Sequence, residues 1–182
     1  MIITPFDYVL ALLYILLFYF IVKKKSRKYE PDLKKYMVTA FFLRMLGSIA
    51  YSMLIYYYYG YGDSFKYFQG SEFITDQIKN DLSNASYLLA SSKEAVEWYN
   101  MVIGDVGLSG YFAIPSAYLM MKISAVISFF SFNRFLIISL FFGFFSFVGQ
   151  WKLFLVFDDI NKHRHRKLIA YAILYTPSIW FW

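Results

Sequence analysis

One stretch near the N-terminus, Ile3–Val22, constrains the fold of the whole chain, because it is long and apolar with a single charged residue, Asp7. A helix needs about 20 predominantly apolar residues to cross a bilayer, and this stretch supplies them. The rest of the sequence agrees, since 59% of the 182 residues are hydrophobic, whereas ordinary soluble domains have roughly 45–50% apolar residues. We therefore expect an all-α, polytopic transmembrane protein.

Further apolar stretches predict the other spans of a single membrane domain, 1–182. We place the spans at about residues 3–22, 36–59, 113–131, 134–157 and 168–182. The last stretch closes on Trp182 without a polar tail, and we expect the chain to be incomplete at its C-terminus. A short turn, Ser131–Arg134, separates the third span from the fourth.

The long polar stretch of about residues 60–112 predicts an external loop, because it is too long for a simple turn. Apolar residues recur there at helical spacing in two sets, Phe65, Phe68, Ile74 and Ile78, then Leu88, Ala95, Tyr99 and Val102. This spacing predicts short amphipathic helices that lie on the outer membrane surface. An external cap without an active role is the alternative.

The basic residues predict the orientation of the chain. Lys23–Lys35 follows the first span at once, and since cytoplasmic loops are enriched in Lys and Arg, we place this loop in the cytoplasm. Asp158–Lys167 is also basic, whereas counting the spans puts it outside. Two explanations stay open: the fourth stretch does not cross fully, or this segment has an external task such as binding lipid phosphate.

Arg44 and Lys122 stand inside predicted spans, where a charged side chain costs about 2.5–3.5 kcal/mol near the bilayer centre unless it faces protein or water. Arg44 is followed on the same helical face by small or polar residues, namely Gly47, Ser48, Tyr51 and Ser52. Such a stripe suits close helix packing and a wet cavity, and snorkelling of Arg44 to the interface is the alternative. For Lys122 in the third span the alternatives are the same, a cation that faces a cavity or one that snorkels to the interface.

Asp63, in YYYYGYGDSFKYF, is the acid that its position singles out. It follows two glycines, which let the backbone turn freely, and it stands where the second predicted span ends. A carboxylate there can act as a general base toward a hydroxyl or amine, or hold a divalent cation that bridges a phosphate. Asp105, in GDVGLSG, is the second candidate, since it is also flanked by glycine and precedes the third span.

Composition excludes several other chemistries. The chain has no cysteine, which excludes thiol catalysis and cysteine metal sites, and its two histidines are neighbours in a basic run. No Walker loop, HExxH, GxSxG or CxxC motif is present. We predict no metal ligand set, leave the cofactor open apart from a divalent cation, and expect lipid headgroups rather than nucleic acid as partners of the basic clusters.

The outward span that ends in YYYYGYGDSFKYF, the long external loop with surface helices and the later block YTPSIWFW resemble the N-terminal part of the GT-C class of membrane glycosyltransferases. More narrowly, they are similar to GT-C-like proteins of Bacteroidetes-type bacteria, from Tyr36 onward. The resemblance implies transfer of a sugar from a polyprenyl-phosphate donor to an acceptor on the external face. It also implies a cell-envelope location, in a bacterial inner membrane with residues 60–112 in the periplasm.

The resemblance implies roles for individual residues as well. Asp63 would be the catalytic base and Asp105 a second catalytic acid. The candidates for substrate binding are Lys66, Tyr67, Arg44, Lys122, Arg164 and Arg166, of which Lys66, Lys122, Arg164 and Arg166 would face the lipid phosphate. The chain departs from the class in one respect, because many members place the loop after their first span and here it follows the second.

Two rival functions stay open. One is a non-catalytic membrane subunit of an envelope assembly or secretion complex, with the external loop as its docking surface. The other is a transporter or flippase whose path is lined by Arg44 and Lys122. The sugar, the acceptor and the oligomeric state are also left open.

Overall fold

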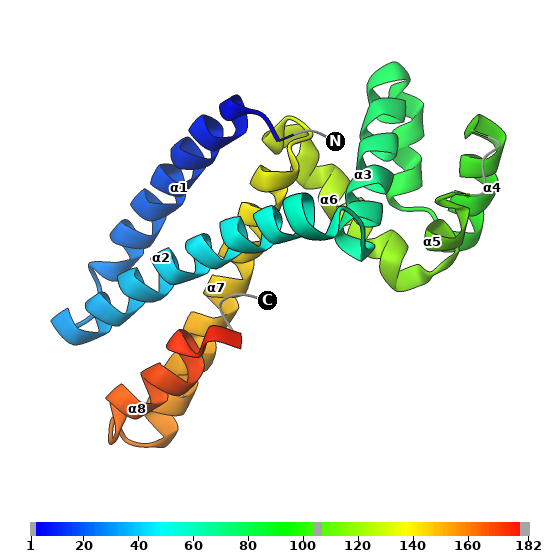
Figure 1. The fold of residues 1–182 in the computed structure, drawn as a ribbon. Coiled ribbons are helices and arrows are strands. Elements are labelled where there is room, and N and C mark those ends of the chain that lie inside the picture. Colours follow the sequence, from blue (N-terminus) through cyan, green and yellow to red (C-terminus); the bar gives the residue numbers. More distant parts are fainter. Residues whose placement is uncertain (1–2, 104–106, 179–182) are drawn as a thin grey trace. The chain divides into compact units, whose positions relative to one another are not determined.

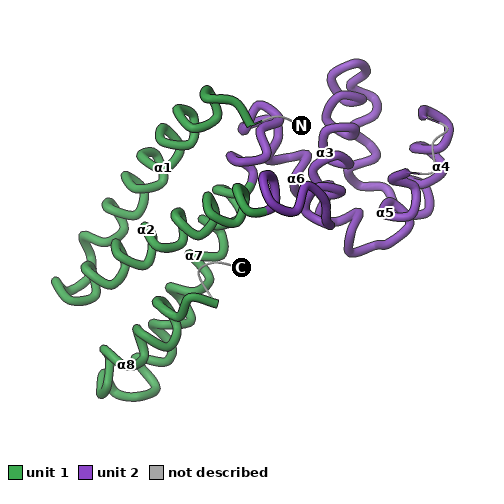
Figure 2. The backbone as a smooth tube through the Cα atoms, in the orientation of Figure 1, with its two compact units in different colours: residues 1–54, 139–182 green, residues 55–138 purple. Residues whose placement is uncertain are grey.

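The computed structural model describes residues 3–103 and 107–178 (Figure 1). The described chain is 86% helix and contains no strand, so the all-α prediction is confirmed. Its residues divide into two compact units, one of residues 1–54 with 139–182 (unit 1) and one of residues 55–138 (unit 2), coloured separately in Figure 2. The single membrane domain stays a prediction.

Unit 1 holds the long helices. Its elements are α1 (Pro5–Ser26), α2 (Pro31–Met53), most of α7 (Phe135–Ile160), α8 (Arg166–Ala170) and the π-helix η3 (Tyr171–Tyr175). Proline is the first residue of α1 and of α2, where its missing N–H costs no hydrogen bond and its fixed φ suits the helix.

Unit 2 holds shorter helices. Its elements are the π-helix η1 (Leu54–Tyr59), which continues α2, then α3 (Asp63–Asn80), the 3₁₀-helix η2 (Leu82–Leu88), α4 (Ser92–Ile103), α5 (Ser109–Ala113) and α6 (Pro115–Ser131). α4 begins with a reciprocal cap, because the Ser91 backbone N–H donates to Glu94 Oε2 at 2.8 Å.

Three helices of the described chain are long and apolar enough to cross a membrane, and they coincide with the predicted spans 3–22, 36–59 and 134–157. They are Pro5–Ser26, Pro31–Tyr59 and Phe135–Ile160. Large apolar side chains stay exposed along α1, as Leu13 and Phe20 show with exposures of 58% and 63%. A bilayer would cover such side chains, and these helices therefore support a membrane protein.

The helices at the other two predicted spans are shorter. α6 has 17 residues, and the apolar block after Asp158–Lys167 forms α8 and the short η3. Membrane crossing by residues 168–182 therefore stays a prediction, and the directions of the long helices bear on that by residues 113–131.

Aromatic contacts show that α1 and α7 run in the same direction within unit 1. The rings of Tyr14 and Phe141 have centroids 5.4 Å apart, and Phe18 stacks on Phe144 at 4.5 Å. Residue numbers rise together along the two helices, which is the pattern of a parallel pair.

α2 and α7 run in opposite directions. Tyr36 contacts Phe154 at a centroid distance of 6.1 Å, whereas Ser48, further along α2, meets Gly143, which comes earlier in α7. The predicted topology, with one crossing at residues 113–131, requires α7 to run parallel to α2. In unit 1 these two helices are antiparallel. A chain that crosses the membrane once between α2 and α7 would make them parallel, so a single crossing at residues 113–131 does not fit unit 1.

The polar stripe of α2 lies in the interior of unit 1, as close helix packing requires. Arg44, Ser48 and Ser52 are buried, and the hydroxyls of Ser48 and Ser52 donate to the carbonyls four residues earlier at 3.0 and 2.8 Å. A Cβ on Gly143 of α7 would lie only 2.0 Å from Ser48 Oγ. Arg44 is 8% exposed, which favours an interior position over snorkelling.

In unit 2, α3 packs along α6. A Cβ on Gly70 would lie 2.4 Å from Met121 Sδ, so glycine permits the close approach of the two helices. The core residues are Ile74, Ile78, Ala95, Trp98, Tyr99, Phe112, Tyr118, Met121 and Ala125. Both predicted amphipathic helices exist, as α3 and α4, and their position on a membrane surface stays a prediction.

We predict that Gly143→Ala destabilises unit 1, because the new methyl group overlaps Ser48 Oγ. Overpacking of this kind costs about 1–3 kcal/mol. The matched control is Gly149→Ala on the same helix, where a Cβ meets nothing within 4 Å and should be neutral or stabilising by up to about 1 kcal/mol. Thermal unfolding in detergent measures both, and adding Ser48→Ala to Gly143→Ala should restore part of the loss. Equal melting temperatures for the two glycine variants would contradict the close contact.

Candidate functional site

The chain turns at two glycines to begin α3 with Asp63. Gly60 has φ +67° and Gly62 has φ +125°, conformations that residues with a Cβ rarely adopt. Asp63 is the first residue of α3 and its side chain is exposed. A carboxylate in the first turn of a helix is stabilised by the unpaired backbone N–H groups there. The GYGD sequence therefore presents an acid to solvent on a fixed helical end.

Asp63 is held by a tyrosine from another helix. Tyr111, in α5, donates its hydroxyl to Asp63 Oδ1 at 2.9 Å. This hydrogen bond raises the pKa of Tyr111 above its ordinary value. Tyr67, one turn after Asp63, lies 6.2 Å from Tyr111 between ring centroids, and burial together with the negative charge of Asp63 raises the pKa of Tyr67. One carboxylate and two phenols thus form a polar cluster in unit 2.

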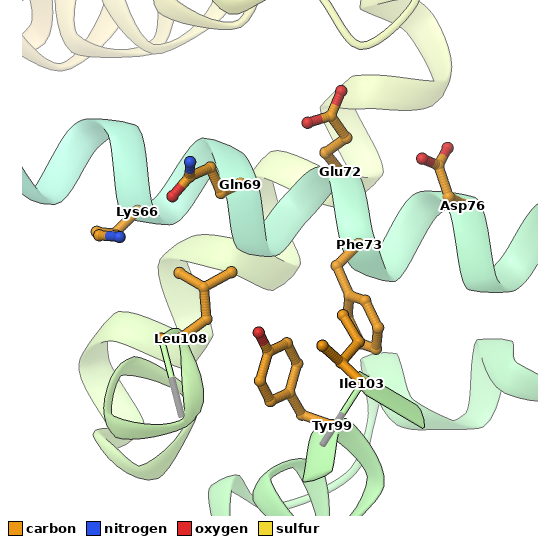
Figure 3. Close-up of a pocket in the computed structure, with 9 residues that line it drawn as sticks. Lys66, Gln69, Glu72, Phe73, Asp76, Tyr99, Ile103 and Leu108 are labelled. Carbon is orange, nitrogen blue, oxygen red and sulfur yellow. The ribbon is translucent and has the colours of Figure 1, made fainter. Parts of the chain in front are cut away.

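A groove of about 450 Å³ lies next along these helices (Figure 3). Its lining residues are Lys66, Gln69, Glu72, Phe73, Asp76, Tyr99, Ile103, Gly107 and Leu108. Asp63 is not part of the lining, but Lys66 follows it by one helical turn, and Leu108 precedes Tyr111 by three residues. The groove therefore begins one turn from the Asp63–Tyr111 hydrogen bond, both along α3 at Lys66 and before α5 at Leu108.

The groove has an apolar floor and a polar rim. In Figure 3 the ring of Tyr99 lies between Leu108 and Phe73, and its hydroxyl is directed toward α3. The carboxylates of Glu72 and Asp76 point away from the Tyr99 ring. Glu72 is half-buried, and this burial, with the negative charge of Asp76, raises the pKa of Glu72. A site with aromatic walls and a few polar groups can bind a small polar ligand that has an apolar face.

The predicted candidates on α3 are brought together. Asp63, Lys66 and Tyr67 lie in its first two turns, where Asp63 is exposed and the other two side chains are half-buried. Asp105, the second predicted catalytic acid, lies outside the described residues. Its role stays a prediction.

Lys122 makes contacts within unit 2 that join α6 to the segment after η2. Its Nζ donates to the carbonyl oxygen of Ala90 at 3.2 Å and lies 4.6 Å above the ring of Tyr118. The Tyr118 hydroxyl donates to the carbonyl of Tyr87, so α6 holds η2 at Tyr87 and the segment after η2 at Ala90. These contacts give Lys122 a structural role, and its binding of lipid phosphate stays without support.

The remaining cations belong to unit 1. Arg44 is buried in α2, whereas Arg164 is exposed in the turn before α8. Arg166 Nε donates to both carboxylate oxygens of Asp158 at 3.1 Å, and its Nη1 donates to Glu30 Oε2 at 3.1 Å. The guanidinium of Arg166 therefore already has two carboxylate partners, and binding of substrate by these three arginines stays a prediction.

Tyr67 was predicted as a site residue, whereas Tyr111, Tyr99 and most of the groove were not. Lys66, Gln69, Phe73 and Asp76 follow one another at intervals of three or four residues, which places them on one face of α3 and is a signal that the sequence does contain. Tyr111 is 48 residues from Asp63, and no local pattern indicates their hydrogen bond.

The chain matches no protein-family model, no curated protein and no solved structure. Within residues 3–103 and 107–178, no group of three or more His, Asp or Glu side chains is placed to hold a metal ion. A divalent cation at Asp63 stays a prediction, and the site is interpreted from its own geometry.

We predict that Glu72→Gln stabilises the protein near neutral pH. Burial raises the pKa of Glu72 in the folded protein above the ordinary value of 4.5. Below pH 4.5 the carboxyl is neutral in both the folded and the unfolded protein and does not affect stability. As pH rises through the raised pKa, the carboxyl ionises more readily in the unfolded protein, which disfavours the folded state. The gain in melting temperature from Glu72→Gln should therefore shrink to nothing below about pH 4.5. Glu97→Gln, at an exposed position of α4, is the control. A gain that persists in acid would contradict the burial of Glu72.

Proposed function

We propose that the protein is a membrane glycosyltransferase that transfers a sugar from a polyprenyl-phosphate donor to an acceptor hydroxyl on the external face of a membrane. The observation that carries the proposal is the exposed Asp63 carboxylate, held at 2.9 Å by the Tyr111 hydroxyl and one turn from a groove that Lys66 lines. An acid, a cation and a ligand-sized groove at one place are the parts that this reaction needs.

Asp63 acts as the general base. A base must be ionised and reachable, and the Asp63 carboxylate is exposed at a helix N-terminus. Tyr111 occupies Oδ1, which leaves the other carboxylate oxygen to accept the proton of the acceptor hydroxyl. The hydrogen bond also fixes the direction of the carboxylate, and positioning of this kind contributes to catalysis.

Lys66 stabilises the leaving group. The acceptor oxygen forms a bond to the anomeric carbon, the bond from that carbon to the phosphate oxygen breaks, and its electron pair leaves with the polyprenyl phosphate. Negative charge on the phosphate grows as the bond breaks, so a cation at that point lowers the barrier. Lys66 lines the groove one turn from Asp63, which brings cation and base to the same end.

The groove accommodates the sugar. Phe73 offers aromatic surface to the apolar face of a sugar ring, and Gln69 offers polar groups to its hydroxyls. The donor carries a lipid chain, and the three helices long and apolar enough to cross a membrane are consistent with a reaction at a bilayer surface.

We predict that Asp63→Asn lowers sugar transfer by about 10²–10⁴-fold, the usual contribution of a general base. Tyr111→Phe should give a smaller loss, because the base remains but is no longer held. The assay uses the membrane-reconstituted protein with polyprenyl-phosphate-linked hexoses labelled in the sugar, and it follows release of polyprenyl phosphate.

The matched control is Glu97→Gln, which removes one exposed carboxylate of unit 2 outside the groove and should keep full activity. Helical content by circular dichroism verifies that each variant is folded. Turnover by folded Asp63→Asn at the wild-type rate would refute Asp63 as the base, and absence of turnover in the wild type with all donors would refute the glycosyltransferase proposal.

A further inference from the structure

The charges of the chain are unevenly divided. Eleven of the 18 Lys and Arg residues lie in two short segments, Lys23–Lys35 and Asp158–Lys167, which contain only four acidic residues. Unit 2 holds five Lys and Arg residues against seven Asp and Glu residues. The positive charge is therefore concentrated in two segments of unit 1 that are more than a hundred residues apart in sequence.

The fold of unit 1 brings these two segments to the same end. α1 and α7 run in parallel, so the segment Lys23–Lys35, which covers the end of α1 and the start of α2, and the turn after α7 lie at matching helix ends. An ion pair joins them directly, because Arg166 Nη1 lies 3.1 Å from Glu30 Oε2.

The turn after α7 is an ordered structure. Lys162, His163 and His165 have positive φ values of 50°, 61° and 57°, which L residues adopt only against steric cost. Asp158 compensates for that cost: its carboxylate is 2% exposed, accepts from Arg166 Nε and lies 2.8 Å from His163 Nδ1. Lys162 and Arg164 stay exposed on this turn.

We propose that Lys23–Lys35 and Asp158–Lys167 form one cationic surface at a single membrane face and that this surface binds the headgroups of anionic phospholipids. The two segments directly adjoin the ends of α1, α2 and α7, the helices that are long and apolar enough to cross a membrane, so their cations lie at the level of the headgroups. Basic clusters next to spans mark the cytoplasmic side, and a shared face satisfies that rule for both segments.

The same arrangement has a consequence for the rest of the chain. Because α2 runs opposite to α7, the chain leaves unit 1 at Leu54 and returns at Ser139, both at the end away from the cationic surface. The inference rests on the contacts within unit 1 and does not depend on the proposed function.

Lipid binding is tested by titrating the purified full chain in nonionic detergent with short-chain phosphatidylglycerol or phosphatidylcholine and following thermal unfolding. We expect phosphatidylglycerol to stabilise at much lower concentration than phosphatidylcholine. Lys162→Asn with Arg164→Gln should weaken the apparent affinity for phosphatidylglycerol by about fivefold for each charge removed. The matched control, Lys79→Gln with Lys93→Gln, removes two exposed charges of unit 2 and should change nothing.

Three outcomes would overturn the proposal. They are equal stabilisation by the two lipids, an equal loss in the control variant, and the same stabilisation by inorganic phosphate as by phosphatidylglycerol, which would assign the surface to free anions. Unfolding measured without lipid verifies that both double variants are folded.

The shared face is tested independently with single cysteines, since the natural chain has none. Lys24→Cys and Arg164→Cys change exposed side chains, so the folded structure should tolerate both. In sealed, oriented vesicles a membrane-impermeant maleimide should label the two positions from the same side. Labelling from opposite sides would refute the single cationic surface.

Discussion

The close antiparallel contact between α2 and α7 at Ser48 and Gly143 is the constraint on which the rest of unit 1 depends. It is possible only because glycine has no side chain and because the Ser48 hydroxyl is turned back to the Arg44 carbonyl. This contact and that of Tyr36 with Phe154 give α7 the direction opposite to α2, and that direction decides which segments of unit 1 meet. Small residues thus determine the path of a chain whose large apolar residues fill the remaining space.

The sequence predicts the three long helices well because apolar length is a local property. Residues 3–22, 36–59 and 134–157 all lie largely within helices of the structure. Residues 113–131 were predicted as a further span from the same signal, but α6 buries Tyr118, Met121 and Ala125 in the core of unit 2. An apolar helix can be covered by lipid or by protein, and its composition alone does not distinguish the two.

The candidate site was predictable in part for a similar reason. The glycines before Asp63 are a local signal, and Lys66 and Tyr67 follow within the next turn. Tyr111 and Tyr99 join the site through the packing of α4 and α5, which no local pattern encodes. Lys122 shows the converse, since the sequence left open a ligand site or snorkelling and did not indicate its hydrogen bond to the backbone carbonyl of Ala90.

The charges of the groove orient the ligand in the proposed reaction. Glu72 and Asp76 repel a phosphate, whereas Lys66 attracts it, so the phosphate of the donor belongs at the Lys66 end. Asp63 lies one turn beyond Lys66, outside the lining of the groove, where an acceptor can approach from solvent. The sugar then extends along the groove over Phe73, where the side-chain amide of Gln69 can form hydrogen bonds with its hydroxyls. In the proposed reaction, one end of α3 would therefore perform the chemistry, and the following turns would hold the substrate.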